Sequence, residues 1–174
     1  MATTEVVGVI LQKMRPRSDE AGYTAYSGIV QGGSTPNELV GYDRFDEGVD
    51  KYVDFLVKIN GYGATTGLTI QLLWSAESAT TGNVYWATSF RRLPLDAEDI
   101  NASHTYTFEE AADAAPSVVG EVVQHAEVMA KADDGMDSVV EDDICILRVR
   151  RTGTNALDTM AGAAFLHAVI VTET

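Results

Sequence analysis

The chain has 174 residues, 45% of them hydrophobic, and this length and composition indicate one globular domain rather than a disordered chain. It holds 12 basic and 26 acidic residues, which give a net charge of −14. This charge argues against nucleic acid or an anionic membrane surface as a partner, because the chain has few cations to neutralise phosphates.

Cysteine content and hydrophobic runs exclude two further classes. Cys145 is the only cysteine, so the chain has no internal disulfide and no cysteine-based zinc site. No stretch approaches the roughly 18 apolar residues of a membrane-spanning helix. Glu5, rather than a basic region, precedes the apolar run 6–11, so we expect no secretory leader.

The first 37 residues differ from the rest of the chain in composition and in the pattern of their apolar residues. The run 6–11 predicts one short strand. Gly22, Gly28 and Pro36 belong to a stretch so rich in breakers that we expect no long strand or helix there. Residues 1–37 are therefore interpreted as an extended arm that orders against a partner. An ordinary N-terminal strand followed by a long surface loop is the alternative.

From residue 38 onward, short apolar runs alternate with period two and are separated by turns rich in Gly, Thr, Ser, Asn and Asp. In the run 52–59, for example, Val53, Phe55, Val57 and Ile59 alternate with more polar positions. The run 122–130 also fits a helix, but Gly120 is a poor N-cap, so a strand is favoured. The predicted strands are 52–59, 68–74, 84–90, 144–151 and 163–172, with weaker candidates at 39–45, 105–108 and 122–130.

About eight short strands with no strand–helix rhythm predict an all-β protein. The expected fold is a jelly-roll-like β-sandwich over residues 38–174, with the N-terminal arm, residues 1–37, as a separate region.

Charged residues cluster in one part of the sequence. Eleven carboxylates and a single lysine, Lys131, lie between Glu109 and Asp143. The run 133–137 is similar to the start of a calcium loop, but Met136 interrupts the alternation of acids. A solvated acidic face is favoured, and a calcium site built from loop carboxylates stays open.

Arg148, Arg150 and Arg151 lie at the end of one predicted strand. Salt bridges to acidic loops of the same chain are one explanation. Burial at a subunit interface is the other, because the planar, weakly hydrated guanidinium suits interfaces.

Candidate catalytic groups have simpler interpretations. Trp74 and Trp86 alternate with aliphatic residues, which favours core packing over sugar-binding platforms. Cys145 alternates with Leu147 and Val149, and His167 lies in a hydrophobic run, so both are expected in the core or at an interface. No nucleophile–base pair, metal set or phosphate-binding loop is present as a motif, so we expect no enzyme, cofactor or metal.

Two groups of residues resemble a pattern in jelly-roll virion proteins of tailed bacteriophages. The first places tryptophans on both sides of a Thr-Gly turn, and the second is an arginine-rich strand before Asp158-Thr159. The resemblance covers about residues 38–174, and it departs at Ala163, where an acid is expected, and at Glu141-Asp142, where Gly-Asp is usual. Its residues are Trp74, Ala76, 80–86, Phe90, 136–138, 147–151 and 158–162.

The resemblance implies a homotrimeric virion protein, assembled in the host cytoplasm and active without catalysis. We expect a capsid decoration (cement) protein that binds the major capsid protein on the outer phage head, stabilises the joints between capsomers, and contacts neither nucleic acid nor membrane. One alternative is a trimeric tail-fibre or receptor-binding head that recognises host-surface glycan, with aromatic loop tips such as Tyr62 or Tyr85. Another is a carbohydrate-active enzyme, which requires two acids in one cleft.

The contact residues follow from the arm and from the arginine-rich strand. An apolar arm can add to a neighbouring subunit, and arginines can pair with acids of the next protomer. The expected capsid or protomer contacts are Val6, Val9, Leu11, Met14, Arg148 and Arg150.

Overall fold

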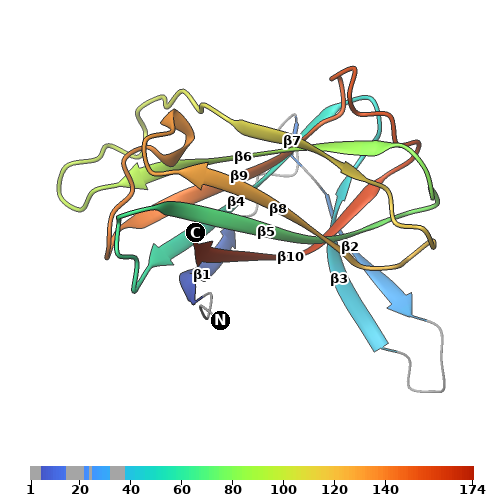
Figure 1. Ribbon diagram of the computed structural model, residues 1–174, viewed down its shortest axis with the longest axis horizontal. Helices are drawn as coiled ribbons and strands as arrows, with labels where there is room; N and C mark the ends of the chain where they lie inside the picture. The colour runs from blue at the N-terminus through green and yellow to red at the C-terminus, as the bar shows by residue number, and fades with distance from the viewer. Residues whose placement is uncertain (1–4, 15–21, 24, 32–37) are drawn as a thin grey trace.

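The computed structural model describes residues 5–14, 22–23, 25–31 and 38–174. Almost all regular structure in this part of the chain is β-strand (Figure 1). The strands are β1 (Val6–Met14), β2 (Ala25–Gln31), β3 (Glu38–Phe45), β4 (Asp50–Ile59), β5 (Gly67–Ala76), β6 (Asn83–Leu93), β7 (Glu109–Ala114), β8 (Val123–Ala130), β9 (Ile144–Thr152) and β10 (Ala164–Glu173), with one 3₁₀ turn, η1 (Asp134–Met136).

Strand pairing divides the molecule into two layers. One layer has the order β3-β10-β5-β8, and the other has the order β4-β9-β6-β7. Every neighbouring pair is antiparallel, and successive strands from β3 to β6 alternate between the layers. This interleaving of two four-stranded layers is the jelly-roll arrangement. The all-β, jelly-roll-like prediction is confirmed.

Strand β1 joins the two layers along one side. It pairs with β4 from Gly8↔Ile59 to Met14↔Asp54, and its first residues pair with β10. A Cβ on Gly8 would overlap the side chain of Val171, so only glycine allows β1 and β10 to approach this closely. On the opposite side β7 lies close to β8, so the sandwich is nearly closed.

The space between the layers is filled by the predicted alternating residues. Trp74 and Trp86 are fully buried, and their rings meet edge to face at 5.9 Å, with Phe45 edge-on to Trp86 at 5.1 Å. The interpretation of both tryptophans as core residues is confirmed. Each buried aromatic side chain removes about 150–250 Å² from water, so these three stabilise much of the sandwich.

The N-terminal region contains more strand than expected. The short strand at 6–11 is confirmed and extends to Met14. The prediction that glycine density prevents a strand is wrong at β2, because Gly28 pairs opposite Gly41 in a regular antiparallel register with β3. Residues 1–4, 15–21, 24 and 32–37 of the expected arm lie outside the described residues.

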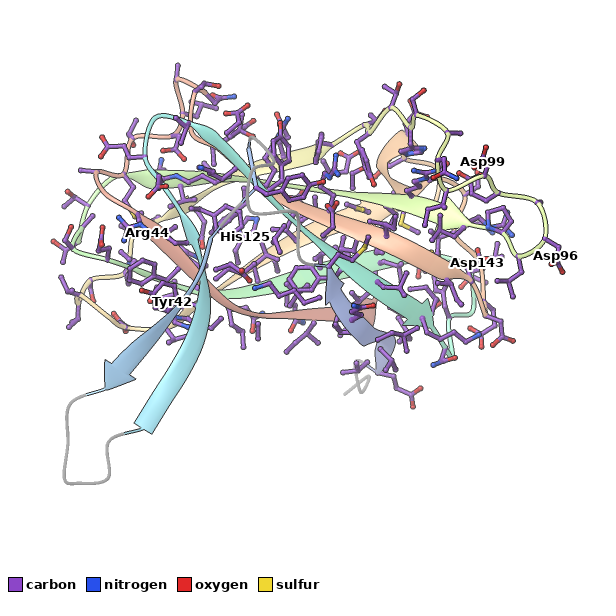
Figure 2. The ribbon with its side chains drawn as sticks, turned by 180° about the vertical axis from the view of Figure 1, so that it is seen from behind. Tyr42, Arg44, Asp96, Asp99, His125 and Asp143 are labelled. Carbon is purple, nitrogen blue, oxygen red and sulfur yellow. The ribbon has the colours of Figure 1, made fainter. Side chains whose placement is uncertain are left out.

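The β2–β3 hairpin extends beyond the sandwich in both views (Figures 1 and 2). Its seven register pairs run from Ala25↔Arg44 to Gln31↔Glu38, whereas β10 pairs only with residues 43–45 of β3. We call the part beyond this contact, residues 28–31 and 38–41, the ribbon.

Two other expectations need correction. Residues 105–108 do not form a strand; the strand is the adjacent β7, whose Glu and Ala residues have low β-propensity. In β10 the period-two alternation expected of the run 163–172 holds only in part, because the register with β5 shifts between Leu166 and Ala168. Leu166 is buried before this bulge and Val171 after it, so the inward positions change from even to odd numbers.

No helix formed by the described residues has the length and apolar character needed to cross a membrane.

Candidate functional site

The predicted contact residues Arg148 and Met14 lie in one row on the outer face of β1, β4 and β9. Along β9, Leu147 and Val149 face the core, so Arg148 and Arg150 lie on the opposite face. The register places Arg148 opposite Asp54 on β4, and Asp54 opposite Met14 on β1. Met14, Asp54 and Arg148 therefore lie in one row across β1, β4 and β9.

Arg148 is bound within its own chain. Its Nε and Nη2 atoms donate hydrogen bonds to the two carboxylate oxygens of Asp54, both at 2.8 Å. Nη2 also donates to the hydroxyl of Tyr23 at 2.6 Å, and that hydroxyl donates to Asp54 at 2.9 Å. Burial, with the nearby Asp54 charge, raises the pKa of Tyr23 to about 12, so Tyr23 is a neutral donor at physiological pH.

Aromatic rings enclose both outward arginines. The guanidinium carbon of Arg148 lies 4.1 Å from the ring centre of Tyr106, and that of Arg150 lies 3.9 Å from the ring centre of Phe108. Tyr52 lies at 5.4 Å from Arg148 and 5.9 Å from Arg150. These distances are within the range of cation–π attraction. Tyr106 and Phe108, which belong to no strand, therefore lie against the sheet through their rings.

Arg150 also has a partner in its own chain, because its Nη2 atom donates to Glu110 of β7. The explanation by salt bridges within the chain accounts for both arginines. We call the set Tyr23, Tyr52, Asp54, Tyr106, Phe108, Glu110, Arg148 and Arg150 the arginine–aromatic cluster.

The other predicted contacts lie along β1, beside the cluster. Val6, Val9 and Leu11 are 61%, 46% and 51% exposed, although β1 pairs with strands on both of its sides. Leu56, opposite Gln12 on β4, is half-buried beside them. We call Val6, Val9 and Leu11 the β1 patch.

Arg151, the third arginine of the strand, faces inward and has a structural role. It is fully buried and donates to Asp158 through Nε at 2.9 Å and Nη2 at 2.7 Å. Its remaining donors reach three carbonyl oxygens, those of Phe45, Met160 and Gly162. All five guanidinium N–H groups are thus satisfied, and Arg151 holds the loop before β10.

A pocket of about 240 Å³ opens where the ribbon joins the body. β10 pairs with β3 up to Leu166 and with β1 from Val171, so the stretch between them borders a gap. Figure 2 shows Tyr42 at this place. Among the described residues that line it, Asp43 is the single carboxylate, and it forms an ion pair with Lys13. The described lining of this pocket therefore lacks the two acids of a glycosidase.

His167 lines the same pocket. Its Nε2 lies 2.9 Å from the hydroxyl of Ser75, and its ring is edge-on to Tyr42 at 6.4 Å. Burial lowers the pKa of His167, so the neutral imidazole is favoured. Ser75 is 1% exposed, which hides the hydroxyl from any substrate. The pair is a packing contact.

The acidic residues do not form a metal site among the residues that the structure describes, where no group of three or more His, Cys, Asp or Glu side chains could hold an ion. Several of them bind backbone or arginine instead: Asp143 accepts from Arg92 at 2.7 Å, and Asp137 accepts from the Arg92 backbone at 2.7 Å. Asp96, Asp99 and Asp143 lie at the end of the molecule opposite Arg44 (Figure 2).

Two single-residue predictions can now be judged. Cys145 is buried as predicted, and burial raises the pKa of its thiol to about 12, which makes it inert as a nucleophile at physiological pH. Tyr62, proposed as an aromatic loop tip, is 2% exposed and cannot serve as one; Tyr85 is half-buried.

The residues that the sequence analysis missed are the partners of the arginines. Period two already places Tyr52 and Asp54 on the face opposite the core, but it does not say which strand lies beside β4. Tyr106 and Phe108 were assigned to a strand of their own. The register of β4 with β9 places Tyr52 and Asp54 beside the arginines, and the ring contacts place Tyr106 and Phe108 over them.

Comparisons with known proteins give a likeness of fold only. No family model and no curated protein matches the sequence. Among solved structures, the chain is similar to the family 11 carbohydrate-binding module of Clostridium thermocellum in complex with a β-1,3-1,4-mixed-linked tetrasaccharide, at 12% identity and a TM-score of 0.40, over 98% of this chain and 97% of that one.

A phage protein is also among the similar structures. It is the enzymatically active domain of tailspike protein 4 from bacteriophage CBA120, at 10% identity and a TM-score of 0.37, over 98% of this chain but 19% of that one. The structural neighbours thus include a carbohydrate-binding module and a phage tailspike domain.

Proposed function

We propose that this protein is a structural virion protein of the capsid-decoration type. It binds the outer surface of a phage head as a homotrimer, contacts the major capsid protein and stabilises the joints between capsomers. It works by burying surface against its neighbours rather than by catalysing a reaction. It resides in the virion.

The observation that carries this proposal is the β1 patch. Strand β1 is paired with β10 and with β4. The exposed side chains of Val6, Val9 and Leu11 therefore do not contribute to the stability of the folded chain by burial. Apolar side chains that lie together in the open mark an interaction surface. The patch follows the N-terminal end of the chain, where an attachment segment was expected.

The charge distribution supports a shell-bound, non-catalytic role. Arg148 and Arg150 form ion pairs with Asp54 and Glu110 of the same chain. Within each of these two pairs the charges cancel, so the net charge of −14 comes from the other residues. A strongly negative net charge keeps concentrated particles from associating.

A lysine on the β1 patch tests the proposal. Val9→Lys and Leu11→Lys place a charge where the contact is expected, and should lower occupancy on phage heads stripped of this protein at least 10-fold. Their free energies of unfolding should change by less than about 0.5 kcal/mol, because both positions are exposed. Val128→Lys is the matched control, since Val128 is 53% exposed on β8 and lies away from β1. Unchanged occupancy of the β1 variants would sink the proposal.

Glycan recognition by a tail-fibre head is the second candidate, and the arginine–aromatic cluster is the observation that favours it. Half-buried rings beside a carboxylate and two guanidiniums offer both apolar and hydrogen-bonding surface to a sugar. A glycan array distinguishes the two functions. Binding that Tyr106→Ala abolishes supports the fibre head, and an array without hits leaves the decoration role.

A further inference from the structure

The ribbon is the part of the described chain with the least support from its own body. Its register pairs Ile29↔Val40, Val30↔Leu39 and Gln31↔Glu38 lie beyond the last residue of β3 that pairs with β10. Within the described residues, β2 pairs with β3 and with no other strand. A two-stranded hairpin without further strands is only marginally stable in water, so packing against another chain would stabilise this segment.

The ribbon carries only one charged residue, Glu38, in an acidic chain. Residues 21–37 contain none of the 12 basic and 26 acidic residues. A second long uncharged run, 59–76, contains β5. That strand lies between β10 and β8 inside the sandwich. Copies of a chain with a net charge of −14 repel each other, and at the ribbon each copy brings only Glu38 to the contact.

The sequence of the ribbon places apolar residues on both of its faces. Consecutive register pairs of a hairpin belong to opposite faces, so the pair at 29 and 40 and the pair at 30 and 39 occupy one face each. All four residues are aliphatic. In addition, β2 has no lysine, proline or charged residue, the usual means by which an edge strand prevents pairing.

We propose that the ribbons of three copies of this chain pack together around a common axis and form the trimer contact. A two-fold dimer offers one contact patch to one neighbour, whereas in a closed ring every copy has two neighbours and both faces of its ribbon are covered. A second copy suits the ribbon better than a charged partner, because the ribbon has almost no charge to complement one. The inference rests on the trimer in the proposed function and does not require attachment to a shell.

The mass of the full-length chain in solution tests the inference. Light scattering after size-exclusion chromatography should give three times the chain mass of 18.7 kDa. Ile29→Lys and Val30→Lys, one on each face, should each give the mass of a single chain with an unchanged far-ultraviolet circular dichroism spectrum. Val118→Lys, at a loop residue that is 61% exposed, should stay trimeric. A wild-type mass of one or two chains, or folded ribbon variants that remain trimeric, would overturn the inference.

Cross-linking keeps the test decisive if a lysine variant fails to fold. Gln31→Cys adds a thiol on the ribbon to a chain whose natural cysteine, Cys145, is buried. A short bis-maleimide should then join chains through the ribbon, and finding only single chains would contradict the inference. A trimer that fails to bind phage heads would sink the decoration role and leave the ribbon contact standing, and a monomer that binds them would do the reverse.

Discussion

The jelly-roll body and the N-terminal region satisfy their residues in different ways. In the body, charged side chains are paired within the chain: Arg151 is enclosed by Asp158 and three carbonyls, and Arg148 by Asp54 and aromatic rings. In the N-terminal region, the β1 patch is exposed and the ribbon leaves the sandwich. The body thus pairs its buried charges within the chain, whereas the N-terminal region leaves apolar side chains of β1 exposed.

This difference between the two regions predicts that substitutions in each will have different effects. Substitutions in the body should change the free energy of unfolding, and substitutions in the β1 patch or the ribbon should change assembly while the fold stays stable. The following variants test the body side of the comparison.

The largest effect is expected at Arg151. Arg151→Leu leaves the carboxylate of Asp158, whose side chain is 1% exposed, buried without its cation. Breaking a buried pair in this way costs about 3–5 kcal/mol. Urea denaturation measures the loss. Arg44→Leu is the control, because its partners Asp46 and Glu77 are 45% and 37% exposed, and it should cost less than about 1 kcal/mol. Equal losses would show that burial does not distinguish the two pairs.

A pH dependence is expected from His167. Because burial lowers its pKa in the folded state, the unfolded chain takes up a proton first as the pH falls below about 6.5. Its contribution to stability is therefore complete above that pH and is lost toward the folded-state pKa, with a slope of at most about 1.4 kcal/mol per pH unit. Thermal unfolding of wild type and His167→Asn between neutral and mildly acidic pH measures it. An identical slope in both proteins would contradict the assignment.

A smaller effect of opposite sign is expected in the core. Thr88 is fully buried on β6, and its hydroxyl has no hydrogen-bond partner among the described residues. Thr88→Val removes an unsatisfied polar group at nearly constant volume and should raise the free energy of unfolding by about 1 kcal/mol. The control is Thr159→Val, which removes the acceptor of the Asn83 N–H and should not stabilise. A destabilised Thr88→Val would mean that the hydroxyl is bound.

The sequence predicted the sandwich well where alternation is regular. Runs such as 52–59 and 68–74 became β4 and β5 with their inward residues as expected. Prediction failed at β2, where paired Gly28 and Gly41 fit a strand, and at β10, where a bulge next to His167 exchanges the faces. The bulge arises from the pairing of β10 with β5, and the alternation of residues within one strand carries no information about that pairing.

The candidate site was predictable in part for the same reason. The outward direction of Arg148 and Arg150 follows from alternation along one strand. Their enclosure by Tyr52 and Tyr106 depends on which strands are neighbours and on a loop that returns across the sheet. Such contacts between distant segments have no signature in a single sequence.

The central claim is that the β1 patch attaches this protein to the outside of a phage head. A reconstruction by electron microscopy of particles that carry the protein tests it most directly. The account predicts three-fold density on the outer shell, with Val6, Val9 and Leu11 turned toward the major capsid protein. Density confined to the tail, or shell density with β1 facing solvent, would contradict it.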